Sequence, residues 1–152
     1  MTSTIKFLVL VSFFSCFLHF ADAFKPIFAL HGIGSGHNDW KHMSQWISTH
    51  HPGTNFVALP VYQDVESYVS LREQVNGIIR FISNITDAQP QVYGQGYHLV
   101  CHSQGALLCR CIAQEWDDHQ ISVFVSLAGP QVQQSQPRTF KSVTQSTTGW
   151  RV

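Results

Sequence analysis

Residues 97–105 read Tyr-His-Leu-Val-Cys-His-Ser-Gln-Gly and give the clearest indication of the fold. This stretch begins with a largely apolar run typical of a buried strand, and a helical pattern follows from about Gln104 through Trp116. Ser103 is therefore expected on a tight turn between a strand and a helix. The N-terminus of that helix, with its unpaired amides, would lie directly behind the serine.

The same alternation of strand and helix extends along the rest of the chain. Apolar runs predict three further strands, at residues 26–30, 55–61 and 121–127. Helical spacing predicts a helix after each of the first two, the second over about 66–83. The first of these helices is expected to be capped by Asn38 or Asp39 and to carry Trp40, Met43, Trp46 and Ile47 on one face. This order of elements predicts an α/β fold with about four parallel strands and helices on both faces.

Ser103 has the position of the nucleophile in the elbow of a hydrolase sheet. The segment C-H-S-Q-G departs from the usual G-x-S-x-G, because Cys101 replaces the first glycine while Gly105 keeps the second. The amide of Gln104, at the start of the helix, can hold a developing oxyanion. The simpler alternative is a serine that only caps this helix, and the strand before it and the helix after it favour the catalytic interpretation.

A glycine-rich turn after the first strand, at residues 31–36, supplies the second half of the expected site. Gly32 allows the backbone to bring an amide toward Ser103, so the N–H groups of Ile33 and Gln104 are the expected oxyanion donors. A dinucleotide site is disfavoured, because the glycines follow G-x-G-x-G rather than G-x-G-x-x-G. The second predicted strand also lacks an acidic residue at its end.

Residues 1–23 have the pattern of a secretory signal peptide. Lys6 precedes an apolar run to Phe20, and a small-residue cleavage pattern ends at Ala23. The run is too short and too often interrupted by polar residues for a membrane anchor, and no second apolar segment of spanning length follows. Export makes Asn84, in the sequence Asn-Ile-Thr, an expected N-glycosylation site. Three of the four cysteines would remain after cleavage, which predicts one disulfide and one odd thiol.

Three segments resemble the palmitoyl-protein thioesterase family: H-G-I-G at 31–34, C-H-S-Q-G-A-L-L-C-R at 101–110 and S-L-A-G-P-Q at 126–131. The resemblance is strongest to the lysosomal second-type branch, which also has a cysteine two residues before the serine, and it covers about residues 25–131. It implies an α/β-hydrolase of the lysosome, reached by the secretory pathway with secretion as the alternative. The implied substrates are long-chain fatty acyl thioesters such as palmitoyl-CoA or S-acylated peptides.

The resemblance also implies roles for individual residues. Ser103 corresponds to the nucleophile, and Gln104 and Ile33 to the donors of the oxyanion amides. In the second-type branch the cysteines that flank the elbow are paired, which implies a disulfide between Cys101 and Cys109 here. The thiol of Cys111, which is not part of that pair, would then be the odd one.

The sequence provides no triad Asp or His at the expected positions. Chain order in this fold places both after the serine, beyond further strands, yet residues 131–152 contain no Asp, Glu or His. We therefore expect an incomplete hydrolase domain at 24–130 and a disordered tail, foreign to the family, in a truncated or alternative form. His31 and His37 are the only candidate substitutes for the base. The alternative function is an inactive form that binds or regulates, because loss of triad members lowers kcat by roughly 10⁴- to 10⁶-fold.

Composition excludes other functions. Nine Lys and Arg residues balance nine Asp and Glu residues, so no basic surface for nucleic acid is expected. The nine histidines and four cysteines show no spacing typical of a zinc site, and we expect neither a metal nor a cofactor. A carboxylester lipase would use the same elbow and differs here only in the thioesterase-like flanks. The oligomeric state is left open.

Overall fold

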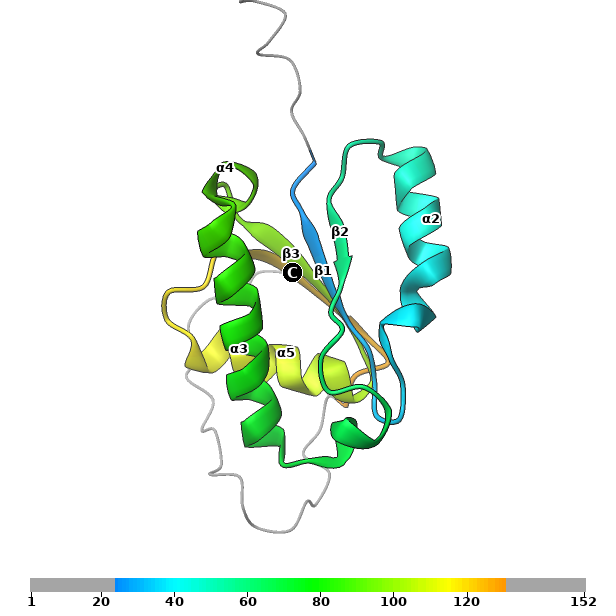
Figure 1. Ribbon diagram of the computed structural model, residues 1–152, viewed down its shortest axis with the longest axis vertical. Helices are drawn as coiled ribbons and strands as arrows, with labels where there is room; N and C mark the ends of the chain where they lie inside the picture. Colours follow the sequence, from blue (N-terminus) through cyan, green and yellow to red (C-terminus); the bar gives the residue numbers. More distant parts are fainter. Residues whose placement is uncertain (1–23, 131–152) are drawn as a thin grey trace, which may run out of the picture.

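The computed structural model describes residues 24–130 (Figure 1). The predictions of a signal peptide at 1–23 and of a tail at 131–152 lie outside the described residues. Four strands form one sheet with all neighbours parallel, in the order β2-β1-β3-β4. They are β1 (Ile27–Leu30), β2 (Phe56–Ala58), β3 (Tyr97–His102) and β4 (Ile121–Leu127). The predicted α/β fold with a four-stranded parallel sheet is confirmed.

Helices cover both faces of this sheet. Figure 1 shows α2 (Lys41–His50) on one side of the strands, and α3 (Leu71–Ala88) with α5 (Gln104–Glu115) on the other. The short helix α4 (Pro90–Tyr93) follows α3, and the 3₁₀ turns η1 (His37–Trp40) and η2 (Asp64–Tyr68) lie in the connections after β1 and β2. Among the described residues, no helix combines the length and the apolar character needed to cross a bilayer.

The core lies between the sheet and the pair α3 and α5. Phe28 is fully buried, its ring stacks on Tyr93 with centroids 5.2 Å apart, and it meets Tyr97 edge-on at 5.0 Å. Leu99 of β3 and Ile112 of α5 are also fully buried. Both belong to the core cluster that packs α5 against β3, on either side of the turn at Ser103.

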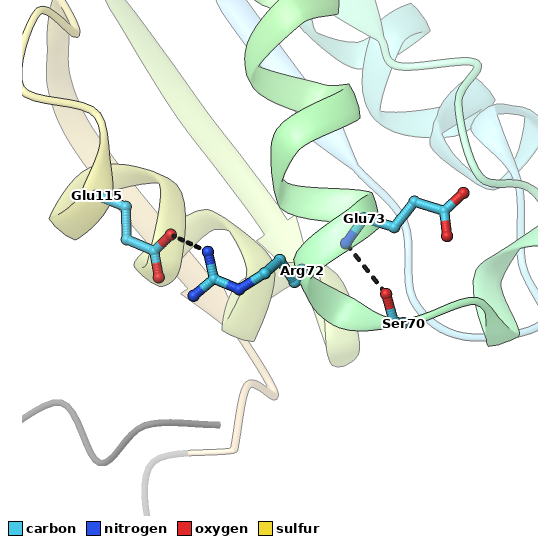
Figure 2. Close-up of polar contacts among 4 residues, drawn as sticks. All are labelled: Ser70, Arg72, Glu73 and Glu115. Atoms are coloured by element: carbon cyan, nitrogen blue, oxygen red, sulfur yellow. Dashed lines mark hydrogen bonds and ion pairs between the residues drawn. The ribbon is translucent and has the colours of Figure 1, made fainter. Parts of the chain in front are cut away.

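The helix predicted over about 66–83 begins later, at Leu71, and ends at Ala88. Val65 and Tyr68 matched the helical spacing, yet they lie in η2 with 80% and 68% of their surface exposed. The helix begins where Ser70 caps it, since the Ser70 Oγ accepts the N–H of Glu73 at 3.2 Å (Figure 2). A side-chain cap therefore decided the boundary, and the apolar spacing did not.

An ion pair links α3 and α5, whereas α2 has no side-chain cap. Arg72 at the start of α3 forms an ion pair with Glu115 at the end of α5, with 3.8 Å between Nη1 and Oε2 (Figure 2). The predicted caps Asn38 and Asp39 lie inside η1, and no side-chain hydrogen bond caps α2. On the predicted apolar face of that helix, Trp40 and Ile47 are buried, Met43 is half-buried and Trp46 is 54% exposed.

Candidate active site

Ser103 joins β3 to α5 in a backbone conformation that residues other than glycine rarely adopt. Its φ is 53° and its ψ is −122°. Such a conformation costs about 1–3 kcal/mol and persists only where the surroundings hold it. Here the Ser103 N–H donates to the Leu127 carbonyl at 2.9 Å, and the Ser103 carbonyl accepts the N–H of Ala106 at 3.0 Å. The expected sharp turn between strand and helix is therefore present, and it contains backbone strain at the serine.

Gly105 allows α5 to approach β1 closely. A Cβ at this position would lie 2.3 Å from the carbonyl oxygen of His31 and 2.7 Å from that of Leu30. Both neighbours are backbone atoms, so no side chain can be accommodated without moving a strand or a helix. The glycine kept in the C-H-S-Q-G segment thus sets the distance between α5 and the end of β1.

The glycine turn after β1 lies against the elbow. A Cβ at Gly32 would lie 3.0 Å from the Cβ of Ser103 and 3.4 Å from Nδ1 of His102. The two segments meet because β1 and β3 are neighbours, with Leu30 paired to Cys101 at their ends. The strand order also reverses between β1 and β3, and in parallel sheets the carboxyl ends at such a point form the usual ligand site.

Two backbone amides flank this contact between Gly32 and Ser103. Gln104 is the first residue of α5, so its N–H has no acceptor within the helix. Ile33 follows Gly32, and among residues 24–130 neither amide donates to another backbone group. Amides of this kind beside a serine can stabilise an oxyanion. Their assignment as the oxyanion donors stays a prediction.

A groove of about 650 Å³ opens beside the elbow. Strand ends and the adjoining turn line one side, and η1 with α2 lines the other. Its residues include Gly32, His102 and Leu127 on the first side and Trp40, Met43 and Trp46 on the second. The second side also carries Asp39 and His42, but the aromatic and thioether side chains give it a large apolar area, so the groove is suited to an apolar ligand.

The two histidines considered as substitutes for a base are held by other groups. Nε2 of the buried His31 lies 3.1 Å from the Val61 carbonyl oxygen, and its Nδ1 lies 2.9 Å from that of Gly32. His37 Nδ1 contacts Oε1 of Gln63. No hydrogen bond joins the Ser103 hydroxyl to a histidine within residues 24–130. The same part of the chain contains no group of three or more His, Cys, Asp or Glu side chains suited to a metal ion.

The sequence matches the family model for palmitoyl protein thioesterase over residues 26–150. The chain belongs to the palmitoyl protein thioesterase family. The match extends past residue 130, the boundary expected from the sequence, into residues that the structure does not describe. With the family known, the four-stranded parallel sheet corresponds to part of an α/β-hydrolase fold.

Curated relatives agree with this membership. The chain is 36% identical over 112 residues to lysosomal thioesterase PPT2 of Homo sapiens, which covers 74% of this chain and 36% of that protein. It is 35% identical to the Bos taurus protein of the same name, with coverage of 74% and 35%, and 29% identical to the PPT2 homolog of Drosophila melanogaster, with coverage of 83% and 43%. The chain thus spans about a third of the length of the mammalian relatives.

A disulfide links the strand and the helix on either side of the elbow at Ser103. Cys101 in β3 and Cys109 in α5 are bonded across a separation of eight residues, which is the pairing that the family resemblance implied. Both side chains are buried. Cys111 is free and also buried, and its burial, with the nearby Glu115 carboxylate, raises the pKa of its thiol. The bond therefore links β3 and α5 on either side of the strained serine.

Removing this disulfide is expected to destabilise the chain. A cross-link closing a loop of this size contributes roughly 2–3 kcal/mol by restricting the unfolded chain, so the double variant Cys101→Ala with Cys109→Ala should lose about that free energy of unfolding. Chemical denaturation with and without a reducing agent measures it. The single variant Cys111→Ala is the control, and reduction should still lower its stability. An unmodified chain whose stability does not respond to reduction would contradict the prediction.

Sequence reasoning missed the segment after β2, residues 61–68, which contacts the glycine turn. Ser67 is 1% exposed, and its Oγ accepts the N–H of Gly34 at 2.8 Å. These residues are 33 positions apart in the chain. No motif or periodicity connects them, since the contact arises only when β1 and β2 pair side by side.

Proposed function

We propose that this chain is a serine hydrolase of long-chain fatty acyl thioesters, such as palmitoyl-CoA or S-palmitoylated protein. The observation that carries the proposal is the strained backbone of Ser103 with Gly32 packed against its Cβ. The apolar groove and the relatives named thioesterase favour an acyl thioester over other substrates of serine hydrolases. The main alternative substrate is a carboxylester, since a carboxylester lipase would use the same elbow.

In the proposed reaction the Ser103 Oγ attacks the acyl carbonyl carbon and forms an ester as the C–S bond breaks and the thiol leaves. The N–H groups of Gln104 and Ile33 would stabilise the negative charge on the carbonyl oxygen. The acyl chain would lie in the groove between the strand ends and α2. Water then hydrolyses the acyl-serine to release the fatty acid. Ser103 must pass its proton to a base, and residues 24–130 supply none at hydrogen-bond distance.

We propose the lysosome, reached through the secretory pathway, as the location of this activity. Support comes from the relatives' printed name and from the signal-peptide pattern at residues 1–23. Asn84, the proposed glycosylation site, lies on α3 with its side chain exposed, so a transferase could reach it. A loss of mass after endoglycosidase treatment would support the secretory route and the glycosylation of Asn84, and co-sedimentation with lysosomes would support the location. A protein found only outside lysosomes would contradict it.

A second candidate function is acyl binding or regulation without turnover. It is favoured by the environment of the histidines, because His31 and His37 contact carbonyl oxygens and Gln63 instead of the serine. A chain of this kind would keep the groove and the oxyanion amides while Ser103 stayed protonated.

One experiment separates the two candidates. The full chain is treated with a long-chain alkyl fluorophosphonate, and the peptide that contains Ser103 is analysed by mass spectrometry. Thiol release from palmitoyl-CoA is followed in parallel. The proposed hydrolase should show a phosphonyl adduct at Ser103 and release of CoA. Saturable binding of palmitoyl-CoA without adduct or thiol release would instead establish the second candidate and overturn the first.

A further inference from the structure

The segment after β2, residues 61–68, wraps around the glycine turn at residues 31–36 and the next residue, His37. Both backbone and side-chain groups take part, and the contacts are spread along the whole turn. Five hydrogen bonds join the two segments. His31 Nε2 lies 3.1 Å from Val61 O, the Gly34 N–H donates to Ser67 Oγ (2.8 Å) and the Asp64 N–H donates to Ser35 O (2.9 Å). Gln63 Oε1 contacts both the His37 N–H (3.1 Å) and His37 Nδ1. The conformation of the glycine turn beside Ser103 therefore depends on residues from the connection between β2 and α3.

The wrapping segment is itself strained. Tyr62 and Asp64 both have positive φ, 52° and 46°, which costs free energy for residues other than glycine. Tyr62 is held in place by α3, where its hydroxyl donates to the Glu73 carbonyl at 3.0 Å. Its ring lies over Gly77, and a Cβ there would come 1.9 Å from the Tyr62 hydroxyl oxygen. The fold thus maintains an unfavourable backbone at the point where this segment meets the turn.

Ser67 connects the turn to the elbow. Its buried Oγ accepts the Gly34 N–H and donates to the Asp64 carbonyl at 2.5 Å. Its carbonyl oxygen accepts Nε2 of Gln104 at 3.3 Å and Nε2 of the buried Gln74 at 2.9 Å. One residue is therefore bonded to both sides of the proposed oxyanion site, to the peptide group after Ile33 and to the side chain of Gln104.

We propose that Ser67 and Gln63 are positioning residues for the acylation of Ser103. They would fix the glycine turn through the N–H groups of Gly34 and His37, and so hold the Ile33 amide in place for the oxyanion. This inference rests on the proposed function. A displacement of about 1 Å at such a site can lower the rate on the order of 10²-fold.

Ser67→Ala tests the inference, with Ser70→Ala as a matched control. Both hydroxyls accept one backbone amide in the same stretch of chain, but the amide bonded to Ser70 belongs to Glu73 in α3. The rate of fluorophosphonate labelling at Ser103 should fall by roughly 10²-fold in Ser67→Ala. In Ser70→Ala it should stay within about twofold, because that variant affects only the helix cap. Equal loss in the two variants would overturn the proposal.

A second pair of variants covers the case in which the buried Ser67 tolerates no change. The half-buried Gln63 accepts the His37 N–H through Oε1. Gln63→Leu removes that acceptor and should slow labelling, whereas Gln63→Glu keeps an accepting oxygen and should restore most of the rate. A rate that is the same in both variants would contradict the role given to Gln63.

Hydrogen exchange separates failure of this inference from failure of the proposed function. The Gly34 amide should exchange faster in Ser67→Ala than in the unmodified chain, and at an unchanged rate in Ser70→Ala. If the unmodified chain is not labelled at Ser103, the proposed function fails and the exchange rates still decide whether Ser67 holds the turn. Unchanged exchange of Gly34 in Ser67→Ala would overturn the positioning role.

Discussion

Ser103→Ala and Ser103→Gly are both expected to abolish labelling and the proposed thioester hydrolysis, but the glycine variant should be the more stable of the two. Loss of a serine nucleophile lowers kcat on the order of 10⁶-fold in well-studied hydrolases. Alanine keeps the strain of a positive φ, while glycine adopts that conformation freely. Strain relief of about 1–3 kcal/mol exceeds the roughly 0.5–1 kcal/mol entropy cost of glycine. The glycine variant should therefore be the more stable by up to about 2 kcal/mol.

Chemical denaturation of the two variants measures this difference. The control pair is Ser48→Ala and Ser48→Gly, because Ser48 is exposed within α2 and its backbone is helical. There glycine should be the less stable by about 1 kcal/mol, according to helix propensity. A glycine variant at 103 that is less stable than the alanine variant would mean that the elbow is unstrained.

Gly105→Ala is expected to cause the largest loss of stability among single substitutions near the site, about 3 kcal/mol. The new Cβ would lie 2.3 Å from the His31 carbonyl oxygen, so α5 and β1 would have to separate. That movement would disturb the packing of the buried Ile112 and Leu30 against their neighbours. Labelling at Ser103 should also be lost, because the turn at 31–36 would no longer meet the elbow.

Gly77→Ala provides the comparison for this prediction. A Cβ at Gly77 would meet the ring of Tyr62, a side chain that can move once its hydrogen bond to the Glu73 carbonyl is broken, whereas Gly105 faces fixed backbone. The Gly77 variant should lose only about 1 kcal/mol, since alanine also favours the helix. Thermal unfolding of both variants checks the contrast, and equal losses would show that backbone contact at Gly105 is not the limiting factor.

The elbow could be predicted because its signals are local. A strand, a serine, a glycine and a helix follow one another within residues 97–116, and each element constrains the next. The pairing of Cys101 with Cys109 is also local, but it came from a family resemblance, since three cysteines alone allow several pairings. The same local order placed β4 at Ile121–Leu127, where the structure has it.

The contacts of Ser67 could not be predicted because they have no local signal. Val65 and Tyr68 fitted a helical period and suggested that Ser67 lay on a helix, yet a 3₁₀ turn places both in solvent and buries the serine between them. Hydrogen bonds between the segments that follow β1 and β2 depend on the order of the strands in the sheet. The spacing of apolar residues along the sequence gives no information about that order. Strain at Tyr62 is equally invisible, since tyrosine does not signal a positive φ, and aspartate at position 64 has only a modest preference for that region.

The burial of the Cys111 thiol limits the stage of folding at which disulfide exchange can occur. Exchange between thiols and disulfides requires a thiolate, and burial keeps this group protonated and inaccessible. Once the chain has folded, Cys111 cannot attack the bond between Cys101 and Cys109. A mispaired molecule would be equally unable to repair itself after its core had closed. Correct oxidation therefore has to be completed while α5 is still accessible, early in the maturation of the protein.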